Sequence, residues 1–195
     1  MRTQQEFLKD LIGRLERDGI PYMIAGSLGS AFHGEPRSTH DVDLVIDPTA
    51  SQLEAFVSGL KDSCYVSPGA AREALARRRM FNVIDAKGTW KADFIIRKDR
   101  PFSREEFNRR RVVTFLDMRA ALSSPEDVIL SKLEWANQGD SERQLRDVAG
   151  VILGQWGKLD EPYLRRWARE LGVEPLLDRV WAEAARARPD ESPGA

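Results

Sequence analysis

The stretch Asp-Val-Asp-Leu-Val-Ile, residues 41–46, decides the fold of this chain. Side chains alternate between the two faces of a β-strand, so Val42, Leu44 and Ile46 are expected in the core. The two aspartates then share the other face, with Cα atoms ~6.5–7 Å apart. Two neighbouring carboxylates repel each other unless a cation lies between them. Oxygen ligands at this spacing suit Mg²⁺, which also accepts phosphate oxygens. The alternative is an edge strand that carries two solvated acids.

A glycine-containing turn precedes this strand. The stretch Ala-Gly-Ser-Leu-Gly-Ser, residues 25–30, follows a short apolar run, and residues 28–33 are expected to form a short helix. Gly26 lets the backbone approach a phosphate, and the N–H groups that open the helix form an anion site. Ser27 can donate its hydroxyl to a phosphate oxygen. The alternative is an ordinary tight turn.

A third carboxylate, Asp93, interrupts a mostly apolar strand expected at residues 89–96. A lone carboxylate in such a strand needs a partner. A metal ion shared with Asp41 and Asp43 would supply one, and the sequence therefore predicts a metal site formed by three aspartates from two strands. The alternative is an ion pair of Asp93 with Lys91 or with an arginine.

The order of these residues resembles the nucleotidyltransferase superfamily, which includes the polymerase-β-like enzymes. Its signature is a Gly-Ser turn, then Asp-x-Asp on a strand, then a third acid on a later strand. The resemblance is closest to the small bacterial proteins of the AbiEii toxin type and their uncharacterised relatives, through His-Gly-Glu-Pro-Arg-Ser-Thr-His-Asp-Val-Asp-Leu (33–44). Pro-Glu-Asp-Val-Ile-Leu-Ser-Lys-Leu (125–133) and Arg-Gln-Leu-Arg-Asp-Val (143–148) resemble their second half. The match covers about residues 20–153.

This resemblance implies a nucleotidyltransferase fold and an enzyme that moves a nucleoside monophosphate from an NTP to a hydroxyl acceptor. The acceptor would be RNA or tRNA, a protein or a small molecule, and pyrophosphate would be released. Two Mg²⁺ or Mn²⁺ ions ~3.5–4 Å apart can hold the triphosphate and stabilise the leaving pyrophosphate. Asp41 and Asp43 would bridge the ions. Asp93 would bind the catalytic ion and orient or deprotonate the acceptor hydroxyl.

Three further residues are candidates for nucleotide binding. Lys132 lies on a helix that opens at Pro125, and it could reach the leaving phosphates. Asp147 follows on the next, antiparallel helix, where the toxin-type resemblance implies a functional acid that could face Lys132. Arg37 could bind a phosphate or brace the acidic strand. The alternatives are a surface lysine at Lys132 and an ordinary helix partner of Arg143 at Asp147.

The composition narrows the class of protein. The 195 residues include 30 basic and 31 acidic side chains, and 42% are hydrophobic, as in globular domains. The only cysteine, Cys64, excludes a disulfide framework and a Cys-based zinc site. Two histidines are too few for a His-rich metal cluster. No apolar run approaches the ~20 residues that cross a bilayer, so we expect a cytoplasmic protein without membrane contact. Residues 72–111 contain 13 basic and 6 acidic residues. This charge of +7 suggests RNA or tRNA contact, or else merely solvated faces.

The pattern of elements predicts an α+β fold. A helix capped by Thr3 comes first. Strands are expected at 22–25, 41–46, 80–85, 89–96 and 112–116, and helices at 49–61 and 67–79. Helices are then expected at about 125–137, 142–154, 161–171 and 174–187. We therefore predict a small mixed β-sheet with flanking helices in residues 1–122. A C-terminal helical bundle, residues 123–190, is predicted to pack on it.

Two other functions remain open at this point. The chain could be a catalytically inactive module that binds a nucleotide or a partner protein on the same fold. It could also be a nucleic-acid-binding protein that uses the basic segment 72–111. The sequence identifies neither the NTP nor the acceptor, and it names no protein partner.

Overall fold

The computed structural model describes residues 2–39, 41–87, 90–139 and 141–188. His40, which belongs to the motif quoted above, lies outside the described residues. The chain divides into two compact units, Met1–Gly29 with Ser38–Ser124 and Ser30–Arg37 with Pro125–Ala195. The short segment Ser30–Arg37 therefore belongs with the second half of the chain. None of the described helices has the length and apolar character needed to cross a lipid bilayer.

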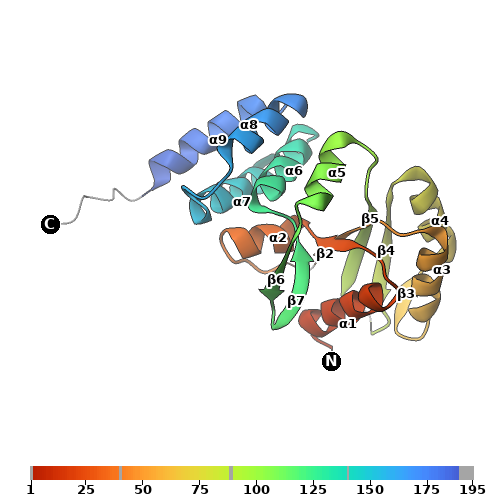
Figure 1. Ribbon diagram of the computed structural model, residues 1–195. Coiled ribbons are helices and arrows are strands. Elements are labelled where there is room, and N and C mark those ends of the chain that lie inside the picture. The colour runs from red at the N-terminus through yellow and green to blue at the C-terminus, as the bar shows by residue number, and fades with distance from the viewer. Residues whose placement is uncertain (1, 40, 88–89, 140, 189–195) are drawn as a thin grey trace. The chain divides into compact units, whose positions relative to one another are not determined.

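The first unit contains a seven-stranded mixed sheet with the order β3-β4-β5-β2-β1-β7-β6 (Figure 1). At its centre, β2 pairs in parallel with β5 and antiparallel with β1. The sheet and its helices confirm the predicted α+β class. The strands are β1 (Tyr22–Ile24), β2 (Asp41–Ile46), β3 (Cys64–Val66), β4 (Met80–Asp85), β5 (Lys91–Ile96), β6 (Arg111–Phe115) and β7 (Met118–Leu122).

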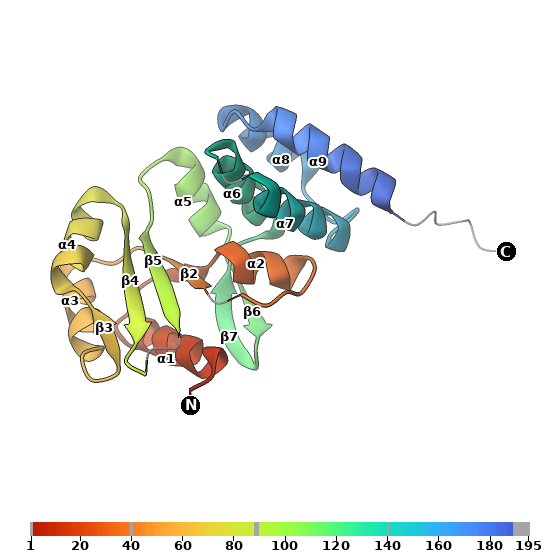
Figure 2. The same ribbon diagram turned by 180° about the vertical axis from the view of Figure 1, so that it is seen from behind.

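Three helices share a hydrophobic core with one face of this sheet. They are α1 (Gln4–Arg17), α3 (Ala50–Gly59) and α4 (Pro68–Arg77), and α3 and α4 lie side by side in both views (Figures 1 and 2). Thr3 and Thr49 form capping boxes, and Ser67 caps α4 ahead of its first-turn proline. The inward residues of β2 are fully buried, as the alternation of its sequence predicts.

Three elements of the first unit have no clear sequence signal. Strand β3 has only three residues, and helix α5 (Pro101–Asn108) opens without a side-chain hydrogen bond from its N-cap residue. Strand β7 consists of Met-Arg-Ala-Ala-Leu, which lacks the β-branched residues typical of strands. It joins β6 through Leu116 and Asp117, both with positive φ angles of 47° and 58°. Asn-Gly or Asp-Gly is the usual sequence signal for such a turn. Neither dipeptide is present here, so local sequence does not predict this hairpin.

The described residues of the second unit form four helices and one turn of a fifth. The four are α6 (Pro125–Asn137), α7 (Ser141–Gly154), α8 (Glu161–Glu170) and α9 (Glu174–Ala187), close to the predicted bounds. Helix α2 (Gly26–His33) starts in the first unit, and its last turn enters the second. The loop after α2 lies directly on α7. A Cβ atom placed on Gly34 would be 2.6 Å from the backbone carbon of Gly150, so only glycine allows this approach.

A cluster of charged side chains ties the loop to two helices of this unit. Arg37 forms two hydrogen bonds with the Asp147 carboxylate, from Nε to Oδ1 at 2.9 Å and from Nη2 to Oδ2 at 2.8 Å. Lys132 on α6 donates to Asp147 Oδ2 at 2.7 Å, and Ser30 donates to the same oxygen at 3.4 Å. The side chains of Lys132 and Asp147 are only 6% and 8% exposed. Asp147 is therefore a buried anion shared by two cations.

The cations control the ionisation of this carboxyl. Burial alone would raise the pKa of Asp147, but the hydrogen bonds and charges of Arg37 and Lys132 outweigh burial and lower that pKa below its usual value. The charged carboxylate therefore stabilises the folded state. A group with a lowered pKa contributes its full stabilisation above its unfolded pKa and loses it as the pH falls through the folded value.

We expect Asp147→Asn to lower the free energy of unfolding by about 3 kcal/mol at pH 7, because it leaves buried Lys132 without its counter-ion. The difference from the wild type should shrink as the pH falls below about 4, where the carboxyl of the unfolded chain is protonated first and that of the folded protein follows at its lower pKa. Urea unfolding followed by circular dichroism between pH 3 and pH 7 measures both effects.

Asp178→Asn is the matched control, since Asp178 is 58% exposed and pairs with Arg165 at the surface of the same unit. Its effect should stay below about 1 kcal/mol at every pH. A difference between Asp147→Asn and the wild type that does not change with pH would contradict this account of the cluster.

Candidate functional site

The three predicted aspartates lie on one face of the sheet in the first unit. Asp41 and Asp43 are on β2 and Asp93 is on the parallel strand β5, where Asp43 is directly opposite Asp93 and Asp41 is opposite Lys91. The intervening residues Val42 and Ala92 are fully buried on the other face. Parallel pairing in this register thus brings the carboxyl-bearing positions of two separate strands together.

The glycine turn lies against these acids. Gly26 has a φ angle of +58°, and a Cβ atom at this position would be 1.9 Å from Oδ2 of Asp43. The backbone of Ala25 also donates a hydrogen bond to the carbonyl oxygen of Asp43, at 3.0 Å. Both the conformation and the close contact require glycine. The start of α2, with Ser27, is therefore held next to the acidic face.

Two neighbours already bind the third aspartate. Asn82 on β4 donates a hydrogen bond to Asp93 Oδ1, and Lys91 Nζ lies 3.2 Å from the same oxygen. Lys91 Nζ is also 3.9 Å from Asp41 Oδ1, so its ammonium bridges two of the three carboxylates. The pairing of Asp93 with Lys91 is the alternative that the sequence left open. Asn82 was not anticipated, although a polar residue within the apolar strand expected at residues 80–85 was an available signal.

The acidic face has suitable ligands for a divalent cation, but its three carboxylates do not converge on one point. Three carboxylates supply the hard oxygen ligands that Mg²⁺ prefers. The described part of the chain contains no three His, Cys, Asp or Glu side chains positioned to hold one metal ion. The Lys91 ammonium pairs with the carboxylates of both Asp41 and Asp93. A metal ion bound by these two carboxylates would have to displace it.

The other three predicted residues come together in the second unit. Arg37, Lys132 and Asp147 form the buried cluster described above, so Lys132 and Asp147 do face each other. Lys132 also donates to Gln144, at 3.0 Å. Its burial excludes the alternative of a surface lysine. In the described residues Arg143 forms no ion pair with Asp147, and Arg37 takes the place of that alternative partner.

The basic segment 72–111 is partly neutralised by carboxylates. At least five of its cations form ion pairs among the described residues, and two carboxylates that they use, Asp41 and Asp47, lie outside the segment. The paired cations are Arg77, Arg78, Lys91, Arg97 and Arg104. The surplus positive charge available to a polyanion is therefore smaller than the sequence suggests.

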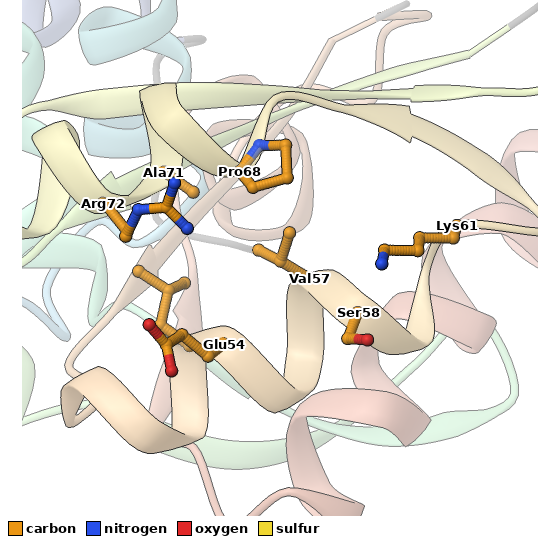
Figure 3. A pocket seen from close by; sticks show the side chains of 8 residues that line it. Glu54, Val57, Ser58, Lys61, Pro68, Ala71 and Arg72 are labelled. Carbon is orange, nitrogen blue, oxygen red and sulfur yellow. The ribbon is translucent and has the colours of Figure 1, made fainter.

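A separate hollow of about 220 Å³ lies between α3 and α4. Figure 3 shows it lined by Val57, Pro68 and Ala71, with Glu54, Lys61 and Arg72 around it. None of the residues that line it is one of the predicted site residues. It offers apolar contacts from two helices and no cluster of catalytic groups.

Comparisons with known proteins identify the fold. No protein-family model and no curated protein matches the sequence. Among solved structures, a nucleotidyltransferase-like protein from Paracoccidioides brasiliensis is 16% identical, with 91% of each chain covered and a TM-score of 0.55. The antibiotic-resistance factor ANT(2'')-Ia is 14% identical, with 92% of this chain and 97% of that chain covered and a TM-score of 0.57.

The lincosamide antibiotic adenylyltransferase LnuA, solved with lincomycin, is also similar. It is 14% identical, with 76% of this chain and 96% of that chain covered and a TM-score of 0.54. Identities this low establish the fold, while the closer likeness to AbiEii-type proteins stays a sequence-based expectation. The chain has the nucleotidyltransferase fold.

Proposed function

We propose that this protein is a metal-dependent nucleotidyltransferase that moves a nucleoside monophosphate from an NTP to a hydroxyl acceptor. The observation that carries the proposal is the placement of Asp41, Asp43 and Asp93 on one sheet face beside Gly26. A purely structural role would not explain why three carboxylates gather where they repel one another. One of the solved structures that share this fold is named as an adenylyltransferase.

Each residue of the acidic face has a proposed role. The backbone at Gly26 and the hydroxyl of Ser27 bind phosphate oxygens of the NTP at the start of α2. Asp41, Asp43 and Asp93 hold Mg²⁺ or Mn²⁺, which when bound neutralises the triphosphate and stabilises the leaving pyrophosphate. Asp93 also orients the acceptor hydroxyl and takes its proton. Asn82 positions Asp93 through its hydrogen bond.

The reaction balances with these groups. The acceptor oxygen forms a bond to the α-phosphorus, while its proton passes to the Asp93 carboxylate. The bond from the α-phosphorus to the oxygen that bridges to the β-phosphorus breaks, and pyrophosphate leaves with that electron pair. Electrostatic stabilisation of the charge that develops on phosphate is the main contribution that such a site can make.

The cluster in the second unit has a proposed supporting role. Arg37 is 29% exposed, whereas Lys132 is almost fully buried against Asp147. We therefore assign phosphate binding to Arg37 before Lys132. Lys132 and Asp147 are proposed to hold Arg37 in place, since Asp147 accepts hydrogen bonds from both cations.

A catalytically inactive binding module is the second candidate. It is favoured by one observation, the Lys91 ammonium that lies between two of the carboxylates. A protein with a permanent internal cation at this position would bind a nucleotide or a partner without transferring anything. The two candidates differ in their response to divalent metal.

The direct test is incubation with labelled NTPs, Mg²⁺ or Mn²⁺ and a panel of acceptors that includes tRNA, protein and small polyhydroxyl molecules. We expect transfer that stops when EDTA removes the metal, and that falls at least about 100-fold in Asp43→Asn, which removes a charged ligand of the proposed metal site. Asp62→Asn, at an exposed position of the same unit, is the matched control. Absence of transfer to every acceptor, together with absence of NTP binding, would refute the proposal.

Gly26→Ala should abolish transfer without unfolding the protein. The added methyl group needs the space of the Asp43 carboxylate and a strained φ angle, so it displaces a metal ligand at a cost of about 1–2 kcal/mol in stability. Gly13→Ala is the control, because nothing lies within 4 Å of a Cβ atom there. That change in α1 should keep transfer intact and stabilise the helix by up to about 1 kcal/mol. Equal activities of the two variants would contradict the proposed role of the turn.

Lys91→Ala should bind Mn²⁺ about tenfold more tightly than the wild type, because it removes a cation that competes for Asp41 and Asp93. Electron paramagnetic resonance of free Mn²⁺ measures this affinity independently of activity. Lys61→Ala, which removes an exposed cation of the same unit, should leave the affinity unchanged. Failure of all three proteins to bind Mn²⁺ would favour the inactive module.

A further inference from the structure

A cavity of about 360 Å³ lies wholly within the second unit. Its walls come from the loop after α2 and from the first half of α7, and its polar lining includes Glu35, Arg37, Arg143, Arg146 and Asp147. This volume is in the range of pockets that bind small ligands. None of these residues is one of the proposed metal ligands.

The backbone preforms this cavity. The loop lies against α7 at Gly34 and Gly150, where a Cβ atom on Gly34 would be 2.6 Å from the backbone. Directly after the end of α7, the Gln155 side chain donates a hydrogen bond to the carbonyl oxygen of His33, at 2.8 Å. Because both contacts involve main-chain atoms, the distance between the two walls is set before any ligand arrives.

The lining has more positive than negative charge. Three arginines face two carboxylates, and the Asp147 carboxylate is already shared between Arg37 and Lys132. In the described part of the chain, the side chains of Arg143 and Arg146 form no hydrogen bond or ion pair with another residue. They are three positions apart on one helix, so their side chains are neighbours and repel each other. An anion between them would relieve this repulsion.

We propose that this cavity binds phosphate groups of a nucleotide or a polynucleotide through Arg37, Arg143 and Arg146. Guanidinium groups present planar pairs of N–H donors that match phosphate oxygens, which makes arginine the usual residue for this ligand. Asp147 holds Arg37 in a fixed orientation at the cavity wall. Glu35 opposes binding, because its carboxylate lies in the same lining. The inference deepens the proposed function at Arg37, yet the binding that it describes needs none of the three acids.

Isothermal titration calorimetry with tripolyphosphate in EDTA tests the proposal without any divalent metal. Arg143→Ala/Arg146→Ala should weaken binding by about tenfold for each arginine removed. Glu35→Gln should strengthen it, since it removes the opposing charge. The control Arg179→Ala/Arg186→Ala removes two exposed arginines of α9 in the same unit and should bind like the wild type. Circular dichroism verifies that each variant is folded.

Two further probes distinguish the source of the phosphate. A nucleotide site binds ATP at least as tightly as tripolyphosphate and shows no gain with longer oligoribonucleotides. A polynucleotide site binds single-stranded oligoribonucleotides more tightly as they lengthen, and the salt slope of its affinity falls by about 1.4 in the double arginine variant.

The proposal is overturned if the wild type binds none of these probes, or if the double arginine variant and the control bind them equally. Because the titration contains no divalent metal, it is independent of nucleotidyl transfer. Absence of transfer with intact tripolyphosphate binding would favour the inactive module over catalysis and leave this proposal standing. Transfer without tripolyphosphate binding would refute this proposal alone.

Discussion

Repulsion among three carboxylates is the constraint on which the first unit depends. The parallel pairing of β2 with β5 puts Asp43 directly beside Asp93, and strand alternation puts Asp41 on the same face. Such a face is stable only if something positive or hydrogen-bonding compensates it. Lys91 and Asn82 provide this compensation. The gathering of carboxylates that the sheet has to compensate is also what makes this face the proposed metal site.

The second unit shows the opposite imbalance. Here one carboxylate, Asp147, serves two cations, and two further arginines on α7 lie nearby without partners among the described residues. Burial makes the inner part of this cluster expensive to break, while the outer arginines remain available to solvent anions. The acidic face of the first unit and the arginine-rich cavity of the second unit thus differ in the sign of their local charge.

Local patterns in the sequence predicted much of this fold. The bounds of β2 and α6 follow from alternation and from a Ser-Pro cap with acids in the first turn, and both agree with the structure. The hairpin of β6 and β7 could not be predicted, because its turn uses Leu116 and Asp117 instead of glycine. Local signals fail where tertiary contacts override the preference of the residues in a turn or a short strand.

The candidate site was likewise predicted where local patterns decide it and missed where tertiary contacts do. Alternation predicts that Asp41 and Asp43 share a face, but the register that sets Asp43 against Asp93 is a property of the assembled sheet. The pairing of Arg37 with Asp147 was equally impossible to predict, because Arg37 lies 110 residues away in the sequence. Helix spacing suggested Arg143 instead, which lies one turn before Asp147 on the same helix.

The separation of Arg37 from Asp147 also affects biosynthesis. Residues 30–37 leave the ribosome well before α7, and at about 5–20 residues per second the delay is roughly 5–20 s. During this interval the sheet strands that follow residue 38 can pair, while the loop still lacks the helix that it will contact. The chain enters the second unit at residues 30–37 and returns before it completes the first. No single cut in the chain therefore separates the two units. A fragment that ends at residue 124 would keep the whole sheet, but its loop would lack the helix that it contacts.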